Sequence, residues 1–189
     1  MKNKVSFFKT AHNYLFCLRF PFWKAYNRVD GEFCGYEFTE YDFIPKGWQK
    51  AFGIKLSKEI KKAGKAYLRT HKEATWEDIL SWQEIKEKYG ELRLYASAID
   101  SIDKILTKYE ALSIAYCQEC GRPARHVALG WVEYLCDRCA EKSRSFTKRL
   151  TEKDIPEMSQ MNNDVWETVD FKKEYGIDFY ELWGLDKKR

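Results

Sequence analysis

Apolar side chains recur at helical spacing in two stretches of the chain. Between residues 55 and 70 they stand three or four residues apart, which places them on one face of a helix. These positions are Leu56, Ile60, Ala63 and Tyr67. A second helix is predicted to begin at a capping box formed by Ser97 and Asp100. Its core-facing positions are Ile99, Ile102, Ile105, Leu106, Tyr109 and Leu112.

Shorter elements are predicted around these two helices. Residues 92–96 alternate between apolar and polar side chains, which is typical of a strand. Thr75 and Asp78 have the spacing of a capping box and predict a short helix. Residues 82–89 are compatible with a helix and with a strand, and residues 33–43 are expected to form a strand with imperfect alternation. The predicted fold class is therefore α+β, a small mixed sheet with packed helices.

Four of the six cysteines form two C-x-x-C pairs. Cys117 stands with Cys120 and Cys136 with Cys139, and fifteen residues separate the pairs. This spacing is typical of a four-cysteine zinc site. Four thiolates occupy all four positions of a tetrahedral coordination sphere and leave none for water. We therefore expect one structural Zn²⁺ per chain. A four-cysteine iron–sulfur cluster fits the same spacing.

The residues around these pairs predict a finger of the treble-clef or zinc-ribbon kind. Residues 125–129 and 131–135 are expected to form two short strands joined near Gly130. Residues 137–150 are predicted to form a helix that carries the second cysteine pair at its N-terminus. The side chains expected to pack inward from this helix are Ala140, Phe146 and Leu150. This order favours a treble clef over a flat three-stranded ribbon.

The remaining cysteines and the histidine of the finger have no metal-ligand spacing. Cys17 and Cys34 are therefore interpreted as buried, inert thiols. His126 lies between the two cysteine pairs, inside a predicted strand, and is interpreted as an ordinary surface or packing residue.

Charge is distributed unevenly along the chain. The net charge is only +4, but residues 1–70 carry 14 basic and 6 acidic side chains, whereas residues 151–189 carry 6 and 10. On the helix over residues 55–70 the basic side chains form a stripe opposite the apolar face: Lys55, Lys58, Lys62, Lys65 and Arg69. Such a stripe either follows the phosphates of a nucleic acid or forms a solvated outer face. Together with Arg122 and Arg125 of the finger, it is our candidate partner-binding surface.

Three parts are expected along the chain. Residues 1–115 form an aromatic-rich α+β body, and residues 116–150 form the finger packed on it. Residues 151–189 form an acidic strap rich in aromatic side chains, which is expected to dock on the basic body. Charged residues interrupt every apolar run, so no membrane-spanning helix is predicted and we expect a cytoplasmic protein.

Several short segments resemble a family of uncharacterised phage and prophage proteins. The first runs from Pro45 to Gly53, and the second is IKEKYG from Ile85 to Gly90 followed by Leu92-Arg93 and Tyr95. The third is the C-x-x-C-G segment with the later C-x-x-C pair. The resemblance covers about residues 20 to 140. It implies an accessory protein that acts in a bacterial host cell on a host component, including a defence system.

Three functional hypotheses follow. The first is a non-enzymatic phage accessory protein that binds and modulates a host protein or a signalling nucleotide and so counteracts bacterial defence. The second is a nucleic-acid-binding protein that uses the basic helix over residues 55–69 and the basic finger. An enzyme is the third hypothesis, although no catalytic motif is present. Its site would be assembled from scattered residues, namely His71, Glu87, Arg93 and Tyr95.

Overall fold

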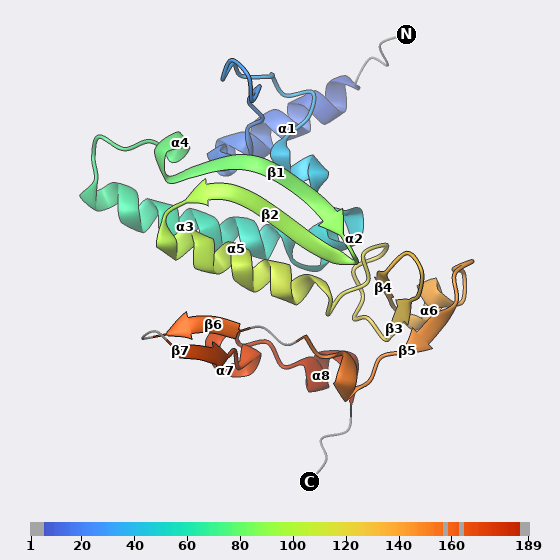
Figure 1. Ribbon diagram of the computed structural model, residues 1–189. Coiled ribbons are helices and arrows are strands. Elements are labelled where there is room, and N and C mark those ends of the chain that lie inside the picture. The colour runs from blue at the N-terminus through green and yellow to red at the C-terminus, as the bar shows by residue number, and fades with distance from the viewer. Residues whose placement is uncertain (1–5, 157–158, 163–164, 186–189) are drawn as a thin grey trace.

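The computed structural model describes residues 6–156, 159–162 and 165–185 (Figure 1). Of residues 159–162 and 165–168 it describes the backbone alone. The predicted α+β class is confirmed, because helices pack with small sheets. In the described ranges every strand pair is antiparallel, where a mixed sheet was expected.

A long β-hairpin lies across two packed helices and forms the body (Figure 1). The hairpin joins β1 (Leu80–Lys88) to β2 (Glu91–Ala98) through Tyr89 and Gly90, whose φ angles are 54° and 78°. Positive φ at both positions is the geometry of a type I′ turn, which matches the twist of the two strands. The helices are α3 (Ile54–Thr70) and α5 (Asp100–Ser113), as their apolar spacing predicts.

Helix α5 covers the outer edge of β2. The backbone N–H of Leu92 donates to the Ser113 hydroxyl at 3.0 Å, and that of Leu94 donates to the Glu110 carboxylate at 2.6 Å. The Ser113 and Glu110 side chains take the place of a further strand, because they accept hydrogen bonds from the backbone N–H groups at the edge of β2. The predicted capping box at Ser97 and Asp100 is wrong, because Ser97 belongs to β2 and the N-cap of α5 is Ile99.

The part of the chain before β1 is helical and irregular. Its elements are α1 (Phe7–Arg19), η1 (Pro21–Trp23), η2 (Glu40–Phe43), α2 (Lys46–Trp48), η3 (Gln49–Gly53), which leads into α3, and then α4 (Trp76–Ile79). The strand predicted over residues 33–43 is wrong, because Phe33 makes only an isolated bridge with Tyr26. Thr39 and Asp42 form a capping box that begins η2, so the extended chain ends there. The capping box predicted at Thr75 and Asp78 is confirmed.

Tryptophan side chains fill the centre of the body. The rings of Trp23 and Trp82 stack with centroids 4.8 Å apart and planes 5° from parallel. The Trp23 indole N–H donates to the Ser57 hydroxyl at 2.9 Å, and the Trp48 indole N–H donates to the backbone carbonyl of Tyr116 at 3.2 Å. Burying these large side chains is favourable because each polar N–H keeps a partner.

The finger contains a three-stranded antiparallel sheet in the order β4-β3-β5. Its elements are β3 (His126–Ala128), β4 (Glu133–Leu135), α6 (Asp137–Ala140) and β5 (Thr147–Arg149). The helix predicted over residues 137–150 is therefore wrong beyond Ala140. The Ser143 hydroxyl accepts from the backbone N–H of Ser145, and this local bond competes with helical pairing. Residues 147–149 then pair with β3, so the finger is nearer to a three-stranded ribbon than to a treble clef.

The C-terminal segment packs on the rest of the chain. It contains η4 (Glu152–Asp154), β6 (Ser159–Asn162), β7 (Val165–Thr168), α7 (Phe171–Tyr175) and α8 (Phe179–Trp183). Phe171, Phe179 and Trp183 join the same buried core as the body. The strap thus docks on its own chain in the described residues. The side chain of Trp166, one of the aromatic residues of the strap, lies outside them.

No helix of the described residues is long and apolar enough to cross a membrane.

Candidate metal centre

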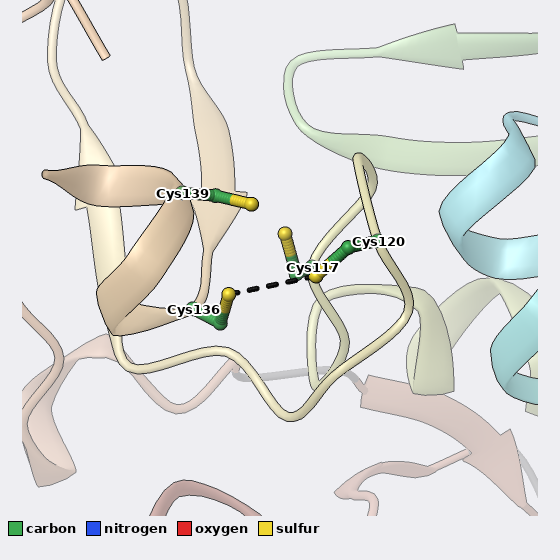
Figure 2. Close-up of side chains that lie close together, drawn as sticks. All are labelled: Cys117, Cys120, Cys136 and Cys139. Carbon is green, nitrogen blue, oxygen red and sulfur yellow. Dashed lines mark hydrogen bonds between the residues drawn. The ribbon is translucent and has the colours of Figure 1, made fainter. Parts of the chain in front are cut away.

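The four cysteines of the two C-x-x-C pairs come together within the finger. Their sulfur atoms all lie within 4.8 Å of one another. Figure 2 shows Cys117 and Cys120 on one loop and Cys136 and Cys139 on the segment opposite, with the sulfurs directed into a common space. Cys117 and Cys136 are buried, whereas Cys120 and Cys139 are partly exposed.

Tight backbone turns place both sulfurs of each pair on the same side. In the first turn the N–H of Cys117 donates to the carbonyl of Arg122 at 2.7 Å, and the N–H of Gly121 donates to the carbonyl of Cys117 at 2.8 Å. Gly121 has a φ of 80°, which favours glycine. In the second turn Cys136 is the N-cap of α6, and the N–H of Cys139 donates to its carbonyl at 3.0 Å.

The donor set fits a single metal ion. A tetrahedral ion with metal–sulfur bonds of about 2.3 Å holds its sulfurs about 3.8 Å apart. The sulfurs of Cys120 and Cys136 are 3.5 Å apart, close to that value. A disulfide needs about 2.05 Å, and all four cysteines are free thiols. Cys117, Cys120, Cys136 and Cys139 can therefore hold a metal ion.

The thiols of the cluster influence one another's ionisation. Burial raises the pKa of Cys117. Burial also acts to raise the pKa of Cys120, but the Arg122 backbone N–H and the neighbouring thiols stabilise its thiolate and lower the pKa to about 7. Burial, followed by the neighbouring cysteines, raises the pKa of Cys139. A metal ion that binds here displaces the remaining thiol protons, so its affinity falls with falling pH.

The first cysteine turn lies directly on the body. The backbone N–H of Gly47 donates to the carbonyl of Gln118 at 2.9 Å. A Cβ on Gly47 would lie 2.3 Å from the carbonyl oxygens of Cys117 and Gln118, so only glycine permits this approach. The cysteine cluster is thereby joined to the start of α2.

The predicted partner-binding side chains differ in how exposed they are. All five cations of the stripe are exposed on α3: Lys55, Lys58, Lys62, Lys65 and Arg69. Arg122 is exposed beside the first cysteine turn. Arg125 is half-buried, because its guanidinium donates to the backbone carbonyl of Leu182 and holds the strap.

The stripe is part of a strongly positive region. Lys61 lies beside it on α3 and donates to the Arg19 carbonyl at 2.5 Å. Burial, and then the positive charges of Lys65 and Arg19, lower the pKa of Lys61. Positive charge is thus concentrated between the end of α1 and the middle of α3.

The sequence did not indicate the exposed apolar side chains at the outer end of the finger. Trp131 is 72% exposed and Phe146 is 75% exposed, and Leu129 lies beside them, since its N–H donates to the Phe146 carbonyl at 2.9 Å. Phe146 was expected to pack inward, and that expectation is wrong because α6 ends before it. Their exposure depends on the β3–β5 pairing, which no local pattern predicts.

The scattered residues of the enzyme hypothesis do not meet. Arg93 and Tyr95 border one shallow pocket on β2, whereas Glu87 and His71 do not line it. The Glu87 carboxylate accepts from the backbone N–H of Gly90 at 2.6 Å, and the His71 ring stacks on Tyr67 at 3.8 Å.

The remaining predictions concern one histidine and two cysteines. His126 lies 2.9 Å from the Asp137 carboxylate and is not part of the metal cluster. Cys17 is buried as predicted, and burial raises its pKa to about 11. Cys34 is exposed, so its predicted burial is wrong, because it lies in the irregular loop between η1 and η2.

In comparisons with known proteins, no family model, curated protein or solved structure matches the chain.

Proposed function

We propose that this chain is a non-enzymatic binding protein with one structural zinc ion. It acts as a phage accessory protein that binds a host protein or a signalling nucleotide. By this binding it counteracts bacterial defence. The convergence of four thiols within 4.8 Å supports the structural metal, and the resemblance of residues 20 to 140 to phage proteins supports the host target. A metal with four cysteine ligands has no open position for water or substrate. Such an ion stabilises the fold, and function then belongs to the surfaces that it holds in place.

Zinc is the metal that this geometry favours. An iron–sulfur cluster places several atoms between its cysteine ligands and spreads their sulfurs farther apart than a single ion does. The close approach of Cys120 and Cys136, at 3.5 Å, supports a single ion. Thiolates in a tetrahedral arrangement are typical ligands of zinc.

A pull-down tests the function. The zinc-loaded chain is incubated with lysate of a bacterial host, and bound proteins and small molecules are identified by mass spectrometry. We expect a protein or nucleotide to be recovered in stoichiometric amount and to be lost when the metal is removed with a chelator. Recovery of neither class of molecule would count against the proposal.

Nucleic-acid binding is the second candidate, and the outer end of the finger favours it. Trp131 is exposed in the turn between β3 and β4, and Phe146 is exposed with Lys142 and Arg144 in the loop between α6 and β5. Exposed aromatic rings beside cations are the usual means of binding single-stranded nucleic acid, because bases stack while cations contact phosphates.

Substitution of Trp131 tests this candidate. We expect Trp131→Ala to weaken binding of a single-stranded oligonucleotide by about 1 kcal/mol or more in a gel-shift titration at several salt concentrations. Phe8→Ala is the matched control, since Phe8 is exposed on α1 away from the finger. The double variant Lys58→Glu with Lys62→Glu tests separately whether the basic stripe on α3 contributes to oligonucleotide binding. Equal affinities of the Trp131 and Phe8 variants, or the absence of a salt-dependent shift, would exclude this use of the finger.

A further inference from the structure

The body contains a cavity of about 510 Å³ on the side of the hairpin that faces η1. Its lining comes from η1, the following loop, the start of η2, α4 and the start of β1. This volume is within the range of small-molecule sites in proteins. The cavity is formed by described residues only, and the metal centre is not part of it.

One wall of the cavity is aromatic and held in place by its neighbours. The rings of Phe22 and Trp76 are 5.0 Å apart, and the Trp82 indole N–H donates to the Phe22 carbonyl at 2.7 Å. A Cβ on Gly64 would lie 2.3 Å from the Trp76 ring, so α3 packs directly behind that ring. Phe22 and Trp82 are buried, whereas Trp76 is partly exposed, so a planar ligand can stack on the Trp76 ring, which its neighbours already orient.

A buried carboxylate lies in the same cavity. The Glu40 side chain is 5% exposed, and among the described residues its hydrogen bonds come from one nitrogen of Arg28, at 3.2 and 3.4 Å. Two carboxylate oxygens can accept about four hydrogen bonds, so most of this capacity is unused. Burying a carboxylate with so few hydrogen-bond donors costs desolvation free energy. A ligand that donates N–H groups to Glu40 would offset this cost.

Cations lie toward the outside of the cavity. The Arg28 side chain is 48% exposed, and Lys24, which is partly exposed, also lines the cavity. Glu77, the second acid of the lining, accepts from the Tyr26 hydroxyl at 2.9 Å. A ligand that matches this arrangement is planar, presents N–H donors to Glu40 and carries a negative group for Lys24 and Arg28.

We infer that this cavity binds a guanine nucleotide. The adjacent N1–H and N2 amino donors of guanine match the two oxygens of Glu40 and replace the long bonds from Arg28. The ring then stacks on Trp76, and the phosphate contacts Lys24 and the released Arg28. Adenine offers only one donor group on this edge, and a simple organic cation would be repelled by Lys24 and Arg28. The inference rests on the proposed function in its nucleotide form.

Calorimetric titration of the zinc-loaded chain with guanosine 5′-monophosphate tests the inference. We expect binding that is about tenfold tighter than that of adenosine 5′-monophosphate, and a loss of about tenfold in Glu40→Gln. Lys24→Ala is expected to weaken binding of the monophosphate and to leave guanosine binding unchanged. Glu37→Gln is the matched control, because Glu37 is exposed outside the cavity. Equal affinity for the two nucleotides, or equal affinity of the Glu37 and Glu40 variants, would overturn the inference.

The stability of the variants separates lost binding from lost folding. Burial raises the pKa of Glu40, with Arg28 lowering it in part, so the ionised side chain opposes folding at neutral pH. Glu40→Gln should therefore melt at the same temperature as the parent chain or higher. If this variant fails to fold, the same titration is made with Lys24→Ala and Trp76→Leu, which are expected to bind guanosine 5′-monophosphate more weakly than the parent chain. A chain that captures a host protein but no guanine nucleotide would remove the cavity proposal and leave the proposed function standing.

Discussion

Replacement of Cys136 with alanine is expected to lower the free energy of unfolding by about 3 kcal/mol or more, because it leaves the metal with three thiolates. Cys136 is buried and is also the N-cap of α6. Its side chain belongs to a small buried cluster with Cys117, Ala128 and Leu135, which forms the centre of the finger. Thermal unfolding followed by circular dichroism, together with metal content, measures the effect.

Cys34→Ala is the matched control for this substitution. Cys34 is exposed and lies outside the metal cluster, so removing its sulfur should leave both the melting temperature and the metal content unchanged. A Cys136→Ala protein that melts with the parent chain would show that the cluster contributes nothing to folding. That result would contradict a structural role for the metal.

Trp183→Ala is expected to destabilise the protein by about 3–5 kcal/mol, the usual range for truncating a buried tryptophan. Trp183 is 1% exposed, and its ring lies 5.1 Å from Phe179 and 6.3 Å from Tyr134 of the finger. Its indole N–H is buried without a protein partner in the described residues, so removing it recovers a small part of that loss. The strap therefore stabilises the finger, although it follows it in the sequence.

Denaturant unfolding of the Trp183 and Trp131 variants gives the comparison directly. Both substitutions remove a tryptophan side chain, but Trp131 is exposed at the end of the finger. We expect Trp131→Ala to change the free energy of unfolding by less than about 0.5 kcal/mol. If the two variants unfold at the same denaturant concentration, the docking of the strap is not part of the stable fold.

The elements that the sequence predicted correctly are those set by residues close together in the chain. The apolar stripe of Leu56, Ile60, Ala63 and Tyr67 and the capping box at Thr75 both identified helices correctly. The spacing of the two C-x-x-C pairs identified a group of four cysteines that could hold a metal ion for the same reason, since each pair occupies one turn of backbone.

Long-range pairing accounts for what the sequence did not predict. The segment after Ala140 was expected to continue as a helix, yet residues 147–149 pair with residues 126–128 of β3. Arg125 was assigned to a partner but contacts Leu182 of the strap. The cavity around Glu40 was not predicted because its walls come from stretches that lie far apart in the sequence, namely residues 21–31, Glu40 and residues 76–83.

Metal analysis of the folded, purified chain tests the central claim most directly. The geometry of Cys117, Cys120, Cys136 and Cys139 predicts a single closed site. Inductively coupled plasma mass spectrometry should therefore find one zinc ion per chain, which Cys136→Ala loses and Cys34→Ala keeps. Iron in place of zinc, or a chain that is fully folded without any metal, would contradict the account.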